Sequence, residues 1–173
     1  PPETPAPPSG AGGDDDGAKD APAPAPPAPP AAPAQTDEER ASKLEAASLK
    51  EQGNAFYKSK RFAEAVDAYS KAAELDPTDI TFLTNRAAAR LESGDAAGAV
   101  ADCDAAVEQG RALRADFKLV AKALARKGAA LAKQGDLEAA IACYQKSLTE
   151  HRAPDALKRL GEAERELKRR KVS

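Results

Sequence analysis

A unit of about 34 residues recurs three times along this chain, and such a repeat restricts the possible folds more than any other feature of the sequence. Counted from Ala46, position 8 is Gly53, and the same position one unit later is Ala87. A third unit begins seven residues late, at Ala121, and places Gly128 at position 8. Because one such unit cannot bury its own hydrophobic face, we expect the three units to stack.

Further positions of the unit carry either a small residue or a larger packing residue in each copy. Positions 20, 24 and 27 are Ala65, Tyr69 and Ala72 in the first unit, Ala99, Cys103 and Ala106 in the second, and Ala140, Tyr144 and Ser147 in the third. Small residues let two helices approach closely, and larger ones fill the gap between them. The pattern predicts an all-α fold: a right-handed superhelical solenoid of three helix pairs, with repeats at about 46–79, 80–113 and 121–154.

Capping and turn residues delimit the predicted helices. Thr36 opens a capping box with Glu39, and the first helix is expected from there to residue 59. Later helices are expected at about 61–74, 79–92, 95–109 and 136–150. Seven extra residues are close to two helical turns, so residues 111–135 are predicted to form one long helix.

A final helix, at about 155–170, is predicted to cover the end of the stack, as solenoids require. Its expected apolar stripe consists of Leu157, Leu160, Ala163 and Leu167. With this capping helix, the folded domain is expected to span residues 36–171.

Residues 1–35 differ sharply from the rest of the chain. They contain twelve of the fourteen prolines and no leucine, isoleucine, valine or aromatic residue. Such a segment cannot bury a core, so we interpret it as a disordered or polyproline II linker. A ligand for SH3 or WW domains is the functional alternative. The opening "PPETPAPP", which lacks a methionine, suggests a fragment of a longer protein, expected to be monomeric.

Composition argues against several classes of function. A net charge of −2 produces no global attraction for nucleic acid or an anionic membrane. The single histidine, His151, lacks partners at metal-ligand spacing, and no nucleotide-binding glycine motif is present, so we expect no enzyme, metal or cofactor. Cys103 and Cys143 fall on apolar helix faces and are expected to be buried free thiols of a cytoplasmic protein.

The basic end "LKRRKVS" has two functional interpretations, a nuclear import signal and a nucleic-acid contact. A solvated final turn of a helix, where cations are favoured, is the simpler interpretation. The absence of an aromatic residue in this segment argues against stacking on single strands.

Polar residues converge on one predicted face of the solenoid. The first helix of each pair lines the concave side, and positions 2, 5, 6 and 9 share that face. The cations and amides at these positions are Lys50, Asn54, Asn85, Lys122 and Arg126. Their complement is a compact pair of carboxylates, such as the end of a chain that terminates in aspartate. A structural hydrogen bond from Asn85 and a spacer that binds no ligand are the alternatives.

At these residues the sequence resembles a known family. "LKEQGNAFY", "TNRAAAR" and "AKALARKGAA" are similar to the carboxylate-clamp tetratricopeptide repeat (TPR) domains of co-chaperone adaptors, and "SLTEHRAPD" resembles the middle TPR domain of the Hop, or stress-inducible, family of Hsp70–Hsp90 organising adaptors. The resemblance implies that the groove binds the C-terminal Met-Glu-Glu-Val-Asp peptide of heat shock protein 90 (Hsp90). The tail of the 70-kDa heat-shock chaperone (Hsp70) is the alternative ligand.

The resemblance also assigns roles to residues. It implies that Lys50, Asn54, Asn85, Lys122 and Arg126 form the carboxylate clamp, and that Tyr57, Thr81, Ala88 and Glu92 line the path of the peptide. Ala129 and Leu119 stand where the family has asparagine and glutamine. These two departures are expected to alter selectivity for the peptide more than binding itself.

Overall fold

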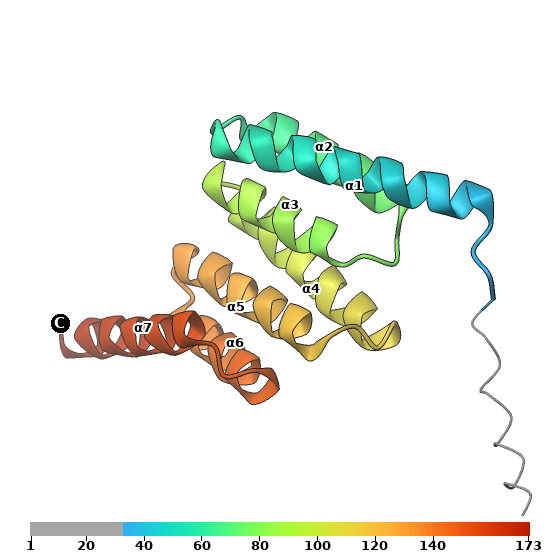
Figure 1. Ribbon diagram of the computed structural model, residues 1–173. Helices are drawn as coiled ribbons and strands as arrows, with labels where there is room; N and C mark the ends of the chain where they lie inside the picture. Colours follow the sequence, from blue (N-terminus) through green and yellow to red (C-terminus); the bar gives the residue numbers. More distant parts are fainter. Residues whose placement is uncertain (1–32) are drawn as a thin grey trace, which may run out of the picture. The chain divides into compact units, whose positions relative to one another are not determined.

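The computed structural model describes residues 33–173, and within this range the chain forms seven helices and no strand (Figure 1). They are α1 (Asp37–Lys58), α2 (Phe62–Leu75), α3 (Thr81–Glu92), α4 (Ala96–Ala112), α5 (Phe117–Lys133), α6 (Leu137–Glu150) and α7 (Pro154–Val172). The all-α prediction is confirmed. Residues 1–32 of the predicted Pro-rich linker lie outside the described range. None of the described helices is long and apolar enough to cross a membrane.

Each helix packs against the next one along the chain, which builds a stack of three helix pairs closed by α7 (Figure 1). In addition, α3 contacts α5, and α5 contacts α7. These cross-contacts place α3, α5 and α7 next to one another. Side chains from these helices can therefore share one surface.

Within a pair, the two helices meet where a glycine faces a tyrosine ring. A Cβ atom added at Gly53 would lie 2.6 Å from the ring of Tyr69, and one added at Gly128 would lie 2.7 Å from the ring of Tyr144. In the middle pair, Ala87 packs in one cluster with the smaller Cys103. A smaller residue at position 8 thus accompanies a larger one at position 24, which keeps the interior closely packed.

The turn inside each pair uses one backbone geometry. Lys60, Gly94 and Gly135 have positive φ values of 60°, 93° and 89°, and each directly follows the C-cap residue of a helix. Asp95 and Asp136 come next and accept hydrogen bonds from the first turn of the following helix. A left-handed residue ends one helix and a cap begins the next, which reverses the chain within a few residues.

The predicted long helix at 111–135 is wrong. α4 continues to Ala112, and the chain then turns at Arg114, whose φ is 51°. The amide of Ala115 donates to the carbonyl of Gly110 at 2.8 Å, and the Asp116 side chain accepts from the Lys118 amide at 2.9 Å. A helix C-terminal motif and a new N-cap therefore divide the segment. The seven extra residues lengthen α4 and this turn instead of α5.

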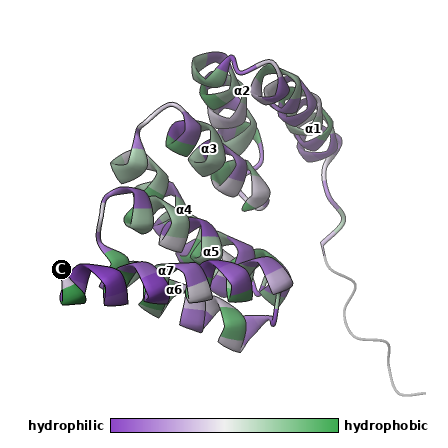
Figure 2. Ribbon diagram, turned by 90° about the vertical axis from the view of Figure 1, so that its left-hand side faces the viewer, coloured by the Kyte–Doolittle hydropathy of each residue, from purple (hydrophilic) through white to green (hydrophobic). Residues whose placement is uncertain are grey.

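The capping helix packs through a slightly different stripe from the predicted one. Leu160, Ala163 and Leu167 lie against the cluster around Tyr144, as expected. Leu157, however, is 48% exposed, and its neighbour Ala156 is buried. Figure 2 shows that most of α7 is hydrophilic, with separate hydrophobic positions along it. One face of α7 therefore covers the stack and leaves polar side chains elsewhere on the helix.

Two further sequence predictions concern side-chain contacts. The capping box of α1 is confirmed, because the Glu39 amide donates to the Thr36 hydroxyl and the Thr36 amide donates to the Glu39 carboxylate. Cys103 and Cys143 are confirmed as buried free thiols. Burial raises the pKa of the Cys103 thiol to about 12, so this thiol stays protonated and unreactive at neutral pH.

A buried ion pair that the sequence did not predict joins three helices. Asp102 of α4, whose side chain is 4% exposed, accepts two hydrogen bonds from Arg86 of α3, at 2.6 and 2.9 Å. Arg90 approaches the same carboxylate at 2.9 Å, and Arg86 also donates to the hydroxyl of Ser70 on α2. Arg90 also lies 3.9 Å from the carboxylate of Asp95, so the two arginines face two carboxylates.

We predict that Gly128→Ala destabilises the domain. The added Cβ would overlap the buried ring of Tyr144, and such overpacking costs roughly 1–3 kcal/mol. This exceeds the gain of about 0.5–1 kcal/mol from replacing glycine in a helix. Urea unfolding monitored by circular dichroism measures the change.

Gly161→Ala is the matched control for Gly128→Ala. Gly161 also lies inside a helix, but a Cβ there meets no atom within 4 Å, so this variant should gain stability. Equal effects of the two alanines would contradict the packing account.

Candidate functional site

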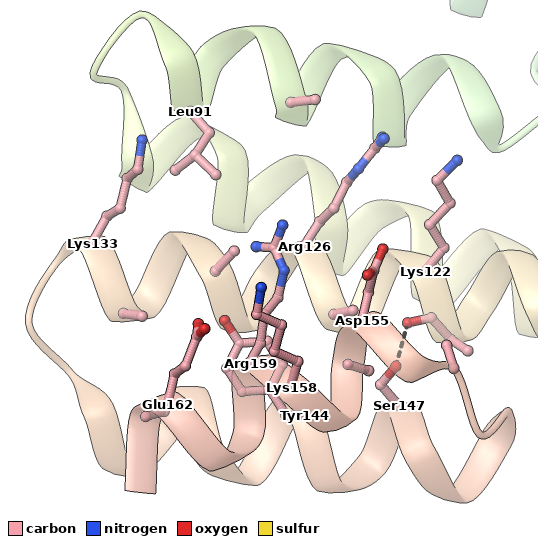
Figure 3. Close-up of a pocket in the computed structure, with 18 of the residues that line it drawn as sticks. Leu91, Lys122, Arg126, Lys133, Tyr144, Ser147, Asp155, Lys158, Arg159 and Glu162 are labelled. Carbon is pink, nitrogen blue, oxygen red and sulfur yellow. Dashed lines mark hydrogen bonds between the residues drawn. The ribbon is translucent and has the colours of Figure 1, made fainter. Parts of the chain in front are cut away.

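A groove with a volume of about 930 Å³ runs between α3, α5 and α7. From α3 it is lined by Ala88, Leu91 and Glu92, and Tyr57 of α1 reaches it as well. Lys122 and Arg126 of α5 line the same groove, and Figure 3 shows both side chains extending away from their helix into it. The groove therefore collects side chains from the first helix of each pair, as the repeat register predicted.

Arg126 is the cation most firmly held by the fold. Its guanidinium donates to the carbonyl of Thr84 and, at 3.3 Å, to the Oδ1 atom of Asn85. Both acceptors belong to α3, so Arg126 links α5 to α3. Burial lowers the pKa of this guanidinium, which nevertheless remains charged at any physiological pH.

The two amides of the predicted clamp are each held through their oxygen. The hydroxyl of Tyr69 donates to Asn54 Oδ1 at 2.6 Å, just as Arg126 donates to Asn85 Oδ1. Within residues 33–173, neither amide NH2 group donates a hydrogen bond of its own. Fixing the oxygen orients the amide, so both NH2 groups are available to an anion.

Lys122 lies in a field of other cations. The charge of Arg126, partial burial and the charge of Lys50 together lower the pKa of Lys122. Among the residues that the structure describes, no carboxylate forms an ion pair with Lys50, Lys122 or Arg126. Three cations from α1 and α5 thus repel one another with no internal counter-ion.

The structure distributes the predicted site residues unevenly. Lys122, Arg126, Tyr57, Ala88 and Glu92 line the groove. Asn85 touches it through Arg126, Asn54 is held by Tyr69, and Lys50 is within electrostatic range of Lys122. Thr81 stands apart from the groove lining: it begins α3, where its hydroxyl donates to Asp79 at 2.6 Å.

Several features of the site were missed at the level of the sequence. The position of Tyr69 in the repeat indicated packing, but its hydrogen bond to Asn54 was not predicted. Glu51, at position 6 of the first unit, adds an exposed acid to this face, and its charge contributes to the raised pKa of Tyr69 after the larger effect of burial. The contribution of α7 to the groove was also missed.

This arrangement favours binding of an anion over chemical catalysis. Ammonium, guanidinium and amide NH2 groups are all hydrogen-bond donors, and the natural partner of such a set is a carboxylate or phosphate. Hydrogen bonds that involve a charged group contribute about 1.5–3 kcal/mol each. A groove of about 930 Å³ has room for more than one residue of a ligand, which favours an extended chain with a carboxylate at its end.

Comparison with known families matches two stretches of the chain. Residues 53–94 match a family described as TPR repeat, and residues 121–151 match the tetratricopeptide repeat. These stretches contain α2, α3 and α6 complete and parts of α1 and α5.

The chain is also similar to part of several curated proteins. It is 58% identical over 126 residues to the Hsp70-Hsp90 organizing protein of Triticum aestivum, and this match covers 69% of this chain and 22% of that protein. It is 52% identical over 132 residues to heat shock protein STI1 of Saccharomyces cerevisiae, covering 76% of this chain and 22% of that protein. The chain thus spans about a fifth of the length of these relatives.

Solved structures share the fold. The TPR2AB-domain:pHSP90-complex of yeast Sti1 is 51% identical with a TM-score of 0.70, over 73% of this chain and 48% of that one. The N-terminal domain of stress-induced protein-1 from C. elegans is 44% identical with a TM-score of 0.65, over 75% of this chain and 99% of that one. The first TPR of Spaghetti (RPAP3), bound to the HSP90 peptide SRMEEVD, is 32% identical with a TM-score of 0.63, over 72% and 94%.

We predict that removing a neighbouring charge raises the pKa of Lys122. Arg126→Leu should produce the larger increase and Lys50→Ala a smaller one, because Arg126 is the main cause of the depression. A titration of the lysine side chains followed by NMR measures both changes. Lys118→Ala, one turn away in the same groove, should leave the pKa of Lys122 in place. An unchanged value in all three variants would refute the cationic cluster.

Proposed function

Because the chain belongs to the tetratricopeptide repeat family, we propose that residues 36–171 form a co-chaperone adaptor domain that binds an acidic C-terminal peptide of Hsp90. The peptide lies in the groove between α3, α5 and α7. Lys50, Asn54, Asn85, Lys122 and Arg126 form a clamp for the two carboxylates of its terminal aspartate. Tyr57, Ala88 and Glu92 lie along the peptide further from its end.

One observation carries this proposal: three cations share a face without an internal counter-ion. Lys50, Lys122 and Arg126 have no acidic partner in the described part of the chain, and their repulsion lowers the pKa of Lys122. Folding alone would favour pairing these charges, as it does for Arg86 and Asp102. Acids such as Glu92 and Asp155 line the same groove but form no ion pair with these cations, and an anionic ligand that completes the cluster is the simplest explanation.

The side-chain amides of Asn54 and Asn85 add oriented hydrogen-bond donors to this cluster. With Asn54 Oδ1 occupied by Tyr69 and Asn85 Oδ1 occupied by Arg126, each amide offers its NH2 group to a carboxylate oxygen. A free chain end in aspartate carries two carboxylates close together, which an internal acidic loop does not. The ligand is therefore expected to enter by its C-terminus.

Names of similar proteins support the same class of ligand. One relative of known structure is a complex of yeast Sti1 with pHSP90, and another holds an HSP90 peptide with the sequence SRMEEVD. The curated relatives are named for organising both Hsp70 and Hsp90. We therefore propose that Hsp90 is the partner of this domain, with the tail of Hsp70 as the competing ligand, and that the domain acts in the cytosol as an adaptor without a catalytic step.

The direct test uses calorimetry with the peptide Ser-Arg-Met-Glu-Glu-Val-Asp in two forms, a free acid and a C-terminal amide. The free acid should bind, and the amide should bind at least tenfold more weakly because it lacks one of the two terminal carboxylates. Equal affinity for the two forms would refute the proposal. Competition with Ser-Gly-Pro-Thr-Ile-Glu-Glu-Val-Asp, a peptide of Hsp70 found in another TPR complex, then ranks the two chaperone tails.

Replacement of a clamp cation should weaken binding strongly. Lys122→Ala or Arg126→Ala is expected to reduce affinity for the free-acid peptide by about ten- to a hundredfold, the loss of one charge-assisted contact. Lys146→Ala, an exposed lysine of α6 outside the groove lining, is the control and should bind as the parent does. Calorimetry that finds unchanged affinity in both clamp variants would contradict the assignment.

Lys122→Ala has a second expected effect that separates binding from folding. Because the neighbouring cations disfavour a charge at Lys122, removing it should leave thermal stability equal or slightly higher in the free domain. A structural role for Lys122 predicts the opposite, a lower Tm.

Salt should weaken the complex. Lys50 is partly exposed and Lys122 is exposed, so the attraction between these charges and an acidic peptide is screened as ionic strength rises. Affinity measured between about 0.05 and 0.5 M NaCl should fall steadily for the free acid and less steeply for Lys122→Ala. A flat profile for the parent domain would indicate that burial of apolar surface, and not charge, drives binding.

A further inference from the structure

The groove extends past the predicted clamp onto α7. This helix contributes no residue to the clamp. Lys158 and Arg159 of α7 line the groove together with Tyr144 of α6. Figure 3 shows the side chains of Lys158 and Arg159 extending from α7 toward α5, where Arg126 lies. The helix that covers the hydrophobic end of the stack therefore also presents two cations to the groove.

Arg159 is close enough to the clamp to act on it electrostatically. Burial and, to a smaller extent, the charge of Arg159 lower the pKa of Arg126. Arg159 also lies beside Tyr144, whose hydroxyl pKa is raised by burial and held down in part by this arginine. Arg159 thus adds a further cation to Lys122 and Arg126 in a groove that Asp155 and Glu162 of α7 also line.

Arg159 forms no ion pair among the described residues, and its hydrogen-bonding neighbour is the neutral hydroxyl of Tyr144. Asp155 and Glu162 are acids of the same helix that line the groove, yet neither forms an ion pair with Arg159 or Lys158. Glu166, by contrast, pairs with arginines of the last turn of α7. Arg159 is therefore available to a ligand in the way that the clamp cations are.

The geometry of an extended peptide connects the two regions. A peptide whose terminal aspartate is held by Lys122 and Arg126 advances about 3.3 Å per residue, and its successive side chains alternate in direction. An acidic side chain a few residues before the end can then reach the α7 wall of the groove. The peptide SRMEEVD contains two such glutamates.

We propose that Arg159, assisted by Lys158, is a second carboxylate site that recognises an acidic side chain upstream of the terminal residue. This inference rests on the proposed function and adds a determinant of ligand sequence to it. The clamp holds the chain end, whereas α7 distinguishes a peptide with acidic residues before its end from one without them. The capping helix is thereby part of the binding surface.

The test is a set of double-mutant cycles with calorimetry on the whole chain. The peptides are Ser-Arg-Met-Glu-Glu-Val-Asp and its two single Glu→Gln forms. Arg159→Ala should weaken binding of the parent peptide by about two- to fivefold, the effect of a partly exposed ion pair. The same variant should bind one of the two Glu→Gln peptides as well as the parent domain binds it.

Arg165→Ala is the matched control, because Arg165 is an exposed arginine of α7 that does not line the groove. It should bind all three peptides as the parent domain does. Since Arg159 is exposed, both variants should keep the parent Tm, which excludes unfolding as the cause of weaker binding.

Charge reversal gives a second readout. Arg159→Glu should weaken binding of the parent peptide further and should prefer the peptide in which the matching glutamate is replaced by lysine. An equal loss for every peptide, or no loss for any of them, would overturn the role of Arg159. Tight binding of the amidated peptide would instead overturn the clamp, so the two proposals fail by different results.

Discussion

The close contact between a glycine on one helix and a tyrosine ring on its partner is the interaction on which the rest of this domain depends. The backbone at Gly53 and Gly128 lies against the rings of Tyr69 and Tyr144, so a side chain at either glycine would overlap the ring. This contact fixes how near the helices of a pair approach each other, and hence where their polar faces lie. In the first pair it does more, because the hydroxyl of the packed Tyr69 holds the amide of Asn54. A packing residue thus also orients a residue of the proposed site.

Charge is treated differently in different parts of the fold. Between α3 and α4, Arg86 and Arg90 both pair with the buried carboxylate of Asp102, and Arg90 also lies 3.9 Å from the carboxylate of Asp95. In the groove, Lys122 and Arg126 form no ion pair with an acid among the described residues, and Arg126 donates to neutral oxygens of α3. Such an arrangement costs stability in the free domain, which an anionic ligand can return on binding. The proposed function is therefore a consequence of which charges the fold leaves unpaired.

Much of the fold could be predicted from the repeat, since Gly53, Tyr69 and their counterparts recur at fixed spacing and specify helix pairs. The long helix at 111–135 could not be excluded in this way, because an arginine in the left-handed conformation, Arg114, carries no turn signal in its identity. Repeat positions also brought the clamp candidates to one face, but considered only the first helix of each pair. For that reason they missed Arg159 on α7. The family resemblance placed Thr81 on the path of the peptide, whereas its hydroxyl donates to Asp79 outside the groove lining.

Asn54 and Asn85 are the only asparagines of the chain, so selective 15N labelling of asparagine restricts the side-chain NH2 signals to these two groups. A 15N NMR titration of these two groups tests the central claim most directly, because the clamp requires both to bind the same chain end. With the free-acid peptide, both NH2 signals should shift together over one binding curve, and the amidated peptide should shift neither to a similar extent. Two signals that stay in place while the peptide binds, or that respond equally to both peptides, would contradict the account.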